Sequence, residues 1–264
     1  MATFTTSDGV RLAFAVEGSG PGVLFHLGAG CDAGLWREAG YLEKLATRYT
    51  CLLFDHRGHG GSDIPRGPAA YELDRMTSDV IEFLDFAGLE SVAFWGYSAG
   101  VSVGVRLAER SPARVWALVA NGSVSPPEPV DELAEWVEAD AQEYREYGWE
   151  KLIELFEEQE REPIPQWMKE RMRATDVEQW VNTFETYPFR QWSAWTALPT
   201  LAVPTLFVTG ELEDPSDRVG GLVAQMLMGE RQRIAGKGHL NVFLASATVL
   251  RFVAPFLQKH TPPN

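Results

Sequence analysis

Residues 91–110 read SVAFWGYSAGVSVGVRLAER and contain one serine held between two glycines. The apolar run at 92–95 has the length of a buried strand and stops at Gly96, while helical spacing begins after Gly100. A strand, a sharp turn and a helix present the serine of Gly-x-Ser-x-Gly as a nucleophile, because the turn is strained and leaves no room for side chains at the flanking positions. The stretch therefore predicts a nucleophile at Ser98. The alternative is a glycine-rich turn without a chemical role.

A serine hydroxyl is a poor nucleophile unless a base accepts its proton and an acid orients that base. His239 is the candidate base, because glycines in the loop at 236–238 let the backbone bring the imidazole over a sheet. The alternative is a histidine on a surface loop. The candidate acid follows the predicted strand 205–209: Asp214, a short carboxylate before a proline, is preferred. Glu213 is the reserve, since one residue of loop variation exchanges the two.

The sequence around these residues alternates short apolar runs with helical stretches, which predicts an α/β fold with a mostly parallel central sheet. The predicted strands are 10–16, 22–27, 50–55, 92–95, 115–120, 205–209 and 231–234, and the predicted helices are 35–49, 77–88, 98–110, 218–228 and 245–259. Parallel strands are buried on both faces, so their sequences are continuously apolar. The candidate acid and base then both follow strands in the second half of the chain.

Three motifs resemble those of α/β-hydrolase-fold enzymes of the esterase, lactonase and cofactor-free haloperoxidase group. They are Gly-Tyr-Ser-Ala-Gly at 96–100, Gly-Lys-Gly-His at 236–239, and Asp-His-Arg-Gly-His-Gly-Gly-Ser at 55–62. The order serine, acid, histidine is also that of the α/β-hydrolase type. The resemblance covers about residues 5–123 and 200–259. It implies a central sheet flanked by helices, with a helical lid inserted, and a structural role for His56 and His59.

The resemblance also indicates where an oxyanion would be held. Ala99, the residue after the nucleophile, is the expected first amide donor. The second is expected from Gly28, with Ala29 as the reserve if the loop is shifted, in the segment His-Leu-Gly-Ala-Gly at 26–30. Leu27 replaces the glycine that is usual in the group, a real departure. Losing one such donor costs about 3 kcal/mol in the barrier, so acyl transfer requires the loop to supply it.

The middle of the chain differs from its two ends. Residues 124–198 contain 18 Asp and Glu against 7 Lys and Arg, a net charge of −11, and show helical faces beginning near 130, 152 and 177 without strands. We predict a core formed by 1–123 and 200–264 and a helical cap at 124–199. The charges alone fit a solvated acidic face over a packed aromatic core. Trp36 and Tyr97 are expected to border a substrate pocket, although both suit a core equally well.

The composition excludes several other classes. The net charge of −14 disfavours nucleic acid as a partner, and no apolar stretch approaches the roughly 20 residues of a membrane span. The N-terminus lacks the basic and apolar regions of a signal peptide, so we expect a cytoplasmic protein. Cys31 and Cys51 are expected to be free thiols, and the five histidines have no metal-ligand spacing. Nothing indicates an oligomeric state.

The function predicted from these patterns is cleavage of a small carboxylic ester or lactone through an acyl-enzyme on Ser98, without a cofactor or a metal. A C–C bond hydrolase or a cofactor-free perhydrolase would use the same three residues, and a ligand receptor built on the same fold is the alternative outside catalysis. A serine at position 98 argues against dehalogenase and epoxide hydrolase chemistry, in which the resembling enzymes use aspartate.

Overall fold

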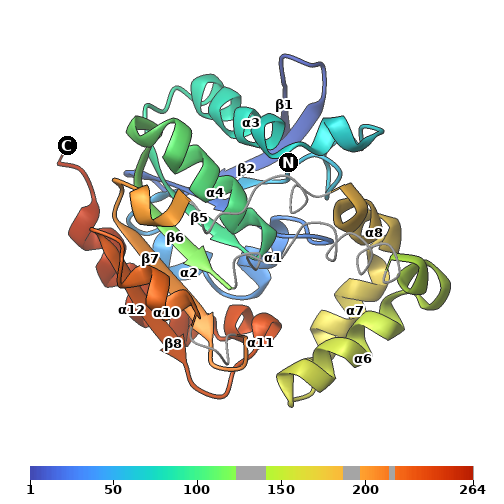
Figure 1. Cartoon of the computed structure of the whole chain (residues 1–264). Helices are drawn as coiled ribbons and strands as arrows, with labels where there is room; N and C mark the ends of the chain where they lie inside the picture. Colours follow the sequence, from blue (N-terminus) through green and yellow to red (C-terminus); the bar gives the residue numbers. More distant parts are fainter. Residues whose placement is uncertain (123–140, 187–196, 214–217, 264) are drawn as a thin grey trace.

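The computed structural model describes residues 1–122, 141–186, 197–213 and 218–263, and is built around an eight-stranded sheet of order β1-β2-β4-β3-β5-β6-β7-β8 (Figure 1). β2 pairs with both β1 and β4 in antiparallel fashion. The remaining neighbours, from β4 and β3 through to β7 and β8, are parallel. The predicted α/β-hydrolase fold is confirmed. The strands are β1 (Ala2–Thr5), β2 (Arg11–Glu17), β3 (Gly22–His26), β4 (Thr50–Phe54), β5 (Val92–Tyr97), β6 (Val115–Asn121), β7 (Thr205–Gly210) and β8 (Gly229–Ile234).

Helices cover both faces of the sheet because alternate side chains of the central strands point in opposite directions. Trp95 of β5 belongs to a hydrophobic cluster with α1 (Gly34–Glu38), α2 (Leu42–Leu45), α11 (His239–Leu244) and α12 (Ser246–His260). Its neighbour Phe94 belongs to a second cluster with α3 (Leu73–Phe86), α4 (Ala99–Arg110) and α10 (Arg218–Val223). Short 3₁₀ turns η1 (Pro68–Tyr71), η2 (Pro112–Arg114) and η4 (Leu198–Thr200) connect these elements.

Several elements differ from the sequence prediction. The predicted helix 35–49 is two short helices, because Gly40 has a φ of +85° and ends the first of them. The predicted helix 218–228 ends at Val223. β1 was not predicted, since three of its four residues are exposed at the sheet edge and the apolar pattern is correspondingly weak.

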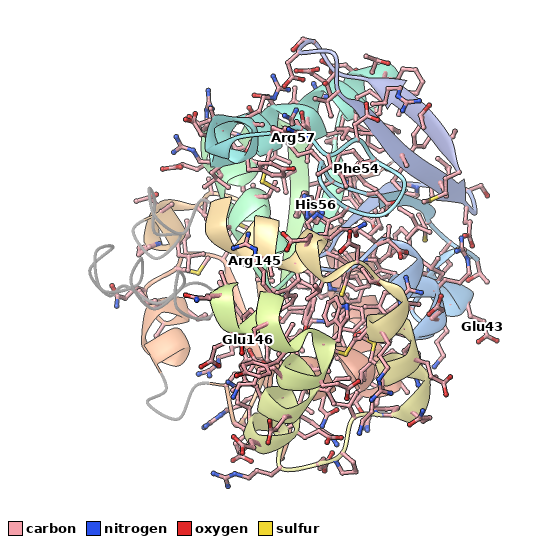
Figure 2. The ribbon with its side chains drawn as sticks, turned by 90° about the vertical axis from the view of Figure 1, so that its right-hand side faces the viewer. Glu43, Phe54, His56, Arg57, Arg145 and Glu146 are labelled. Carbon is pink, nitrogen blue, oxygen red and sulfur yellow. The ribbon has the colours of Figure 1, made fainter. Side chains whose placement is uncertain are left out.

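A group of helices lies between β6 and η4, which we call the insert (residues 141–186). It contains α6 (Trp149–Glu160), α7 (Gln166–Ala174), which was not predicted, and α8 (Val177–Thr186). Figure 2 labels Arg145 and Glu146 on the insert, and Phe54, His56 and Arg57 on the core. The lower boundary of the predicted cap, at 124, lies outside the described residues, and the upper boundary falls within η4.

The insert is packed on the core rather than around a centre of its own. Its buried side chains belong to the same cluster as Trp95 and the helices on that face, and they include Leu152, Ile153, Met168, Met172 and Val181. An ion pair adds a polar contact, in which Arg171 of α7 lies 2.6 Å from Asp32 of the core. Within the part of the chain that the structure describes, no helix has both the length and the apolar character needed to cross a membrane.

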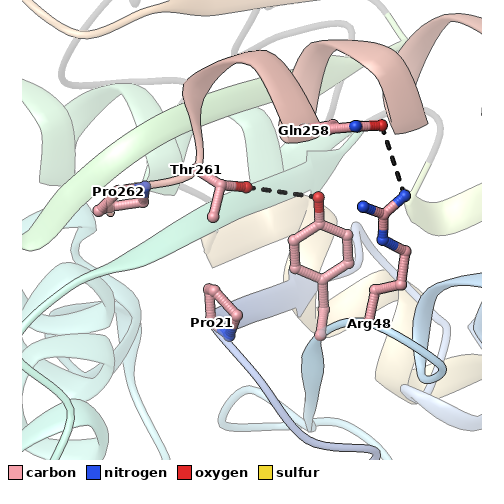
Figure 3. A pocket seen from close by; sticks show the side chains of 6 residues that line it. Pro21, Arg48, Gln258, Thr261 and Pro262 are labelled. Atoms are coloured by element: carbon pink, nitrogen blue, oxygen red, sulfur yellow. Dashed lines mark hydrogen bonds between the residues drawn. The ribbon is translucent and has the colours of Figure 1, made fainter. Parts of the chain in front are cut away.

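The end of α12 is attached to the core beside the start of β3 (Figure 3). Arg48 Nη1 donates to Gln258 Oε1 at 3.4 Å, and the hydroxyls of Tyr49 and Thr261 lie 3.4 Å apart. Pro21 and Pro262 complete the lining of this surface depression. None of these residues belongs to the site predicted from the sequence, so the depression has a structural explanation in the docking of the last helix.

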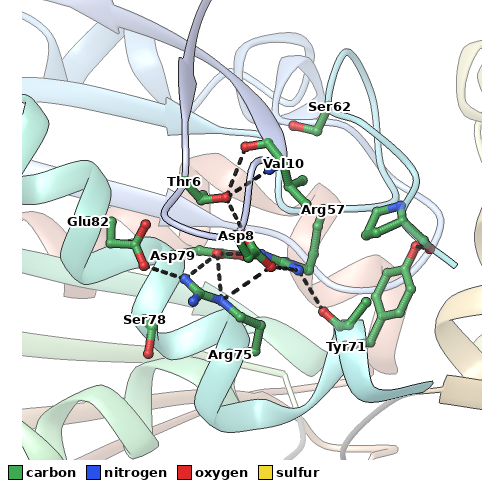
Figure 4. Close-up of polar contacts among 12 residues, drawn as sticks. Thr6, Asp8, Val10, Arg57, Ser62, Tyr71, Arg75, Ser78, Asp79 and Glu82 are labelled. Carbon is green, nitrogen blue, oxygen red and sulfur yellow. Dashed lines mark hydrogen bonds and ion pairs between the residues drawn. The ribbon is translucent and has the colours of Figure 1, made fainter. Parts of the chain in front are cut away.

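The segment at 55–62 is anchored by a buried arginine (Figure 4). Arg57 has no exposed surface, and its Nε and Nη2 donate to the two carboxylate oxygens of Asp79 at 2.6 and 2.7 Å. Its Nη1 donates to Asp8 at 3.0 Å and to the carbonyl of Ala70 at 2.9 Å. A bidentate pair of this kind neutralises the buried charges and also fixes the position of the loop, because its geometry is specific.

We expect Arg57→Met to lower the free energy of unfolding by about 3 to 5 kcal/mol, because Asp79 would remain buried without its bidentate partner. Unfolding in guanidinium chloride, followed by circular dichroism, measures the change. Arg11→Met is the control, since the Arg11–Asp63 pair is exposed and its removal should leave the midpoint almost unchanged. Equal losses in the two variants would contradict the anchoring role.

Candidate active site

Ser98 occupies the turn between β5 and α4 with a φ of 55° and a ψ of −126°. Such a conformation costs a non-glycine residue on the order of 1–3 kcal/mol, so it persists only where the surroundings impose it. A Cβ on Gly96 would lie 2.5 Å from the carbonyl oxygen of Gly100, and one on Gly100 would lie 2.4 Å from that of His26. Both glycines are therefore required by close backbone contacts, which is the steric reason expected from the sequence.

The imidazole of His239 lies beside this serine although 141 residues separate them in the chain. His239 Nε2 is 2.9 Å from Ser98 Oγ. The ring of Tyr97 is stacked on the imidazole with centroids 5.1 Å apart, and its hydroxyl donates to the His239 carbonyl at 3.1 Å. Gly122 leaves the necessary space, since a Cβ there would lie 3.0 Å from His239 Cε1. The predicted nucleophile and base are thus in hydrogen-bond contact.

Glu213, the reserve acid, lies on the other side of the imidazole. Its Oε2 is 3.3 Å from His239 Nδ1, and its Oε1 accepts the Gly210 N–H at 3.0 Å. The Glu213 side chain is only 2% exposed, so the carboxylate is shielded and held in place. Asp214, the preferred acid in the sequence prediction, lies outside the described residues.

The electrostatic surroundings favour a histidine that binds its proton more tightly than usual. Burial by itself lowers the pKa of His239, but the hydrogen bond and the charge of Glu213, with a further contribution from Glu160, outweigh it and raise the pKa above the usual 6.5. A positive charge formed on this ring during a reaction is therefore stabilised. The arrangement can remove a proton from Ser98 and return it to a departing group.

The loop after β3 lies directly against the nucleophile. A Cβ on Gly28 would be 2.7 Å from Ser98 Cβ, 3.0 Å from Ser98 Oγ and 3.1 Å from the backbone nitrogen of Ala99. The loop is held against the segment at 55–62, because the Gly30 N–H donates to His59 Nε2 at 2.8 Å. Gly28 and Ala99, the two expected amide donors, thus lie next to each other at the serine, and Ala29 follows on the same loop, half-buried.

Three buried histidines connect that loop to the segment anchored by Arg57. The rings of His26 and His56 are stacked with centroids 4.8 Å apart, and the rings of His56 and His59 have centroids 3.8 Å apart and are tilted by 32°. Burial lowers the pKa of His26 and of His59 to about 4, and that of His56 well below its usual value. The stack is therefore uncharged near neutral pH, which lets His59 Nε2 accept from Gly30, and the expected structural role of His56 and His59 agrees with these contacts.

Aromatic side chains of the insert cover the same loop. A Cβ on Gly30 would lie 2.6 Å from the ring of Trp180 and 3.2 Å from that of Trp149. Trp180 also packs edge-on against Phe156, with centroids 5.9 Å apart. The sequence did not identify this contact, because nothing in the spacing relates Gly30 to residues more than a hundred positions later.

The two residues predicted to border a pocket are placed differently. Trp36 has no exposed surface and packs against Phe25, Tyr41 and Phe243 with centroids 5.1, 5.0 and 4.9 Å away. It therefore belongs to the core, and its expected place at the pocket border is corrected. Tyr97 is 6% exposed and supports the imidazole of His239.

A strained serine between glycines, a histidine in contact with it and a buried carboxylate on the far side of the histidine lie together at the carboxyl edge of a parallel sheet. The sequence model of the α/β hydrolase fold matches residues 21–245, and the chain belongs to this family. The family and the fold agree with the resemblance found in the sequence.

Several proteins with names of hydrolytic enzymes are similar to the chain. It is 36% identical over 112 residues to a protein named putative carbamate hydrolase RutD of Azorhizobium caulinodans, covering 42% of this chain and 41% of that protein. It is 32% identical over 149 residues to 3-oxoadipate enol-lactonase 2 of Acinetobacter baylyi, covering 55% and 52%. The match thus spans about half, or less, of these relatives. A thermophilic esterase from Thermogutta terrifontis has the same fold, with a TM-score of 0.81 and 22% identity over 98% of this chain and 97% of that one.

We expect Gly28→Ala to reduce the reactivity of Ser98 toward a fluorophosphonate about 100-fold, because the added methyl group would occupy the space beside Oγ and the Ala99 amide. The second-order rate constant of labelling, followed by mass spectrometry, measures the effect. Gly221→Ala is a matched control, since a Cβ there meets nothing within 4 Å. Undiminished labelling of Gly28→Ala would remove this loop from the site.

Proposed function

We propose that this α/β hydrolase cleaves carboxylic esters or lactones through an acyl-enzyme on Ser98, with His239 as the base and Glu213 as the acid. The observation that supports it most strongly is the 2.9 Å contact between Ser98 Oγ and His239 Nε2, at a strained turn whose geometry exposes the hydroxyl. Glu213 is preferred to Asp214 because its carboxylate lies 3.3 Å from His239 Nδ1.

The reaction follows from these positions. His239 Nε2 accepts the Ser98 proton as Oγ attacks the carbonyl carbon, and the resulting oxyanion is held by the amides of Ala99 and of Gly28 or Ala29. His239 then protonates the departing alkoxide, so that the alcohol leaves and an ester of Ser98 remains. Water, deprotonated by His239, attacks that ester, and the acid is released as Oγ recovers its proton.

The aromatic side chains of the insert favour an apolar acyl or alcohol group as substrate. Trp149 and Trp180 cover Gly30 on the oxyanion loop, so a group bound next to Ser98 would lie against them. We infer that the insert acts as the cap of the site and that the substrate is a small uncharged ester or lactone. The names of the similar lactonase and carbamate hydrolase support a panel that contains lactones, aryl esters and carbamate esters.

The chemistry is tested by Ser98→Ala, for which we expect kcat/KM on p-nitrophenyl acetate to fall about 10,000-fold or more, because the attacking oxygen is lost. Ser102→Ala, one turn along the same helix, is the control and should keep its activity. A Ser98→Ala enzyme with full activity would exclude the proposed mechanism.

The acid is tested by comparing Glu213→Gln with Asp214→Asn. We expect Glu213→Gln to reduce kcat/KM on the order of 10³-fold, since the imidazolium loses its charged partner, and Asp214→Asn to have a small effect. The opposite ranking would restore Asp214 as the acid.

The pH dependence follows from the pKa of His239. His239 acts as a base only when it is neutral, so activity should be lost as the pH falls through its pKa. We expect the acid-side inflection of kcat/KM to lie above the usual histidine value of 6.5 and to move to lower pH in Glu213→Gln, because removing the carboxylate charge makes protonation less favourable. An inflection that does not move in this variant would contradict the contact between Glu213 and His239.

A further inference from the structure

A second buried carboxylate, on the insert, holds the backbone on both sides of His239. Glu160 is the last residue of α6 and has no exposed surface. Its Oε2 accepts the N–H of Gly238 at 2.9 Å, and its Oε1 accepts the N–H of Leu240 at 2.5 Å. The two amides flank the histidine, so a side chain 79 residues earlier in the chain determines the position of its backbone.

The glycine before His239 is explained by this carboxylate. Gly238 has a φ of −97°, which any residue adopts, so its own conformation does not require glycine. A Cβ there would instead lie 2.7 Å from Glu160 Oε2 and 2.8 Å from its carboxyl carbon. The second glycine of Gly-Lys-Gly-His therefore makes room for the insert to reach the backbone.

The groups around the imidazole show why the charge of Glu160 matters. His239 faces Glu213 from the loop after β7, Glu160 from α6, Tyr97 from β5 and the Ser98 hydroxyl. A buried carboxylate is costly unless hydrogen-bonded, and backbone N–H groups compensate Glu160. Beside it, Glu162 is paired with Lys237 at 2.7 Å. Replacing Glu160 by a neutral side chain would remove both the backbone contacts and one of two negative charges near the ring.

We propose that Glu160 is a positioning residue that couples the insert to the catalytic base: its carboxylate fixes the backbone at 238–240 so that His239 reaches Ser98. This inference rests on the proposed function, because it assigns His239 the role of base. The contact makes the seating of α6 on the core a condition for an assembled site. The insert therefore does more than cover the substrate.

The test compares Glu160→Gln with Glu158→Gln, an exposed glutamate on the same helix. The readout is the rate at which a fluorophosphonate labels Ser98 in the full chain, measured as a function of pH. This labelling reaction needs His239 as a base but does not depend on a particular ester. We expect Glu160→Gln to lower the rate at neutral pH about 10- to 100-fold, as a small displacement of a catalytic group does. We also expect its acid-side inflection to move to lower pH, while Glu158→Gln matches the wild type.

Circular dichroism establishes that each variant is folded. A folded Glu160→Gln with the wild-type rate and inflection overturns the proposal, and so does a loss of rate with an unmoved inflection, which indicates a merely structural role. If Glu160→Gln does not fold, Glu160→Asp replaces it: the charge remains but the oxygens are withdrawn by one methylene, so the rate should fall, and an unchanged rate rejects the coupling.

The two proposals fail in distinguishable ways. A wild-type protein that is labelled at Ser98 but cleaves no ester or lactone rejects the proposed substrates and leaves the comparison of Glu160 with Glu158 valid. Ester cleavage with equal labelling in Glu160→Gln and Glu158→Gln rejects only the role of Glu160. An unlabelled wild type rejects Ser98 as the nucleophile and the coupling with it.

Discussion

The site depends on the close approach of three backbone segments around Ser98. The strained conformation of this serine, with a φ of 55°, is maintained because the end of β5, the start of α4 and the loop after β3 are packed in contact. Gly96, Gly100 and Gly28 permit that contact, and a methyl group at any of them would meet another atom within 3 Å. The strain is sustained by packing, and it aims the hydroxyl at the edge of the sheet.

The loop that packs against this turn is held in place by contacts that lie away from Ser98. The loop that carries Gly28 is tied through Gly30 to His59, and the segment of His59 is tied through Arg57 to Asp79 on α3. These buried histidines remain neutral near pH 7 because burial lowers their pKa values, so the support does not vary with pH in the working range. The loop that carries Gly28 is thus positioned from the sheet side by hydrogen bonds and from the insert side by tryptophan rings.

The histidine is supported by both layers of the protein. Tyr97 of the core stacks on its ring, and Glu160 of the insert holds its backbone. Consequently, residues of both the insert and the core position the same histidine. At least one acidic residue of the insert, Glu160, has a defined structural contact. A reading of the insert as a solvated acidic face over an aromatic core accounts for most of its charges but not for this buried one.

The sequence by itself determined the fold, and it singled out the serine and the histidine that lie in contact, because local patterns encode them: apolar strands of fixed length, glycines beside a strained turn, and a glycine-containing loop after a strand. It could not choose between two adjacent carboxylates, since one residue of loop path decides which reaches the imidazole, and in the structure it is Glu213 that lies there. It placed Trp36 at a pocket, although aromatic side chains suit a core equally, and it did not identify the contact of Glu160 with the backbone beside His239 or that of Trp180 with Gly30. Those residues meet the site only across long separations in the chain, and such contacts are set by how helices dock on the sheet, which no local spacing records.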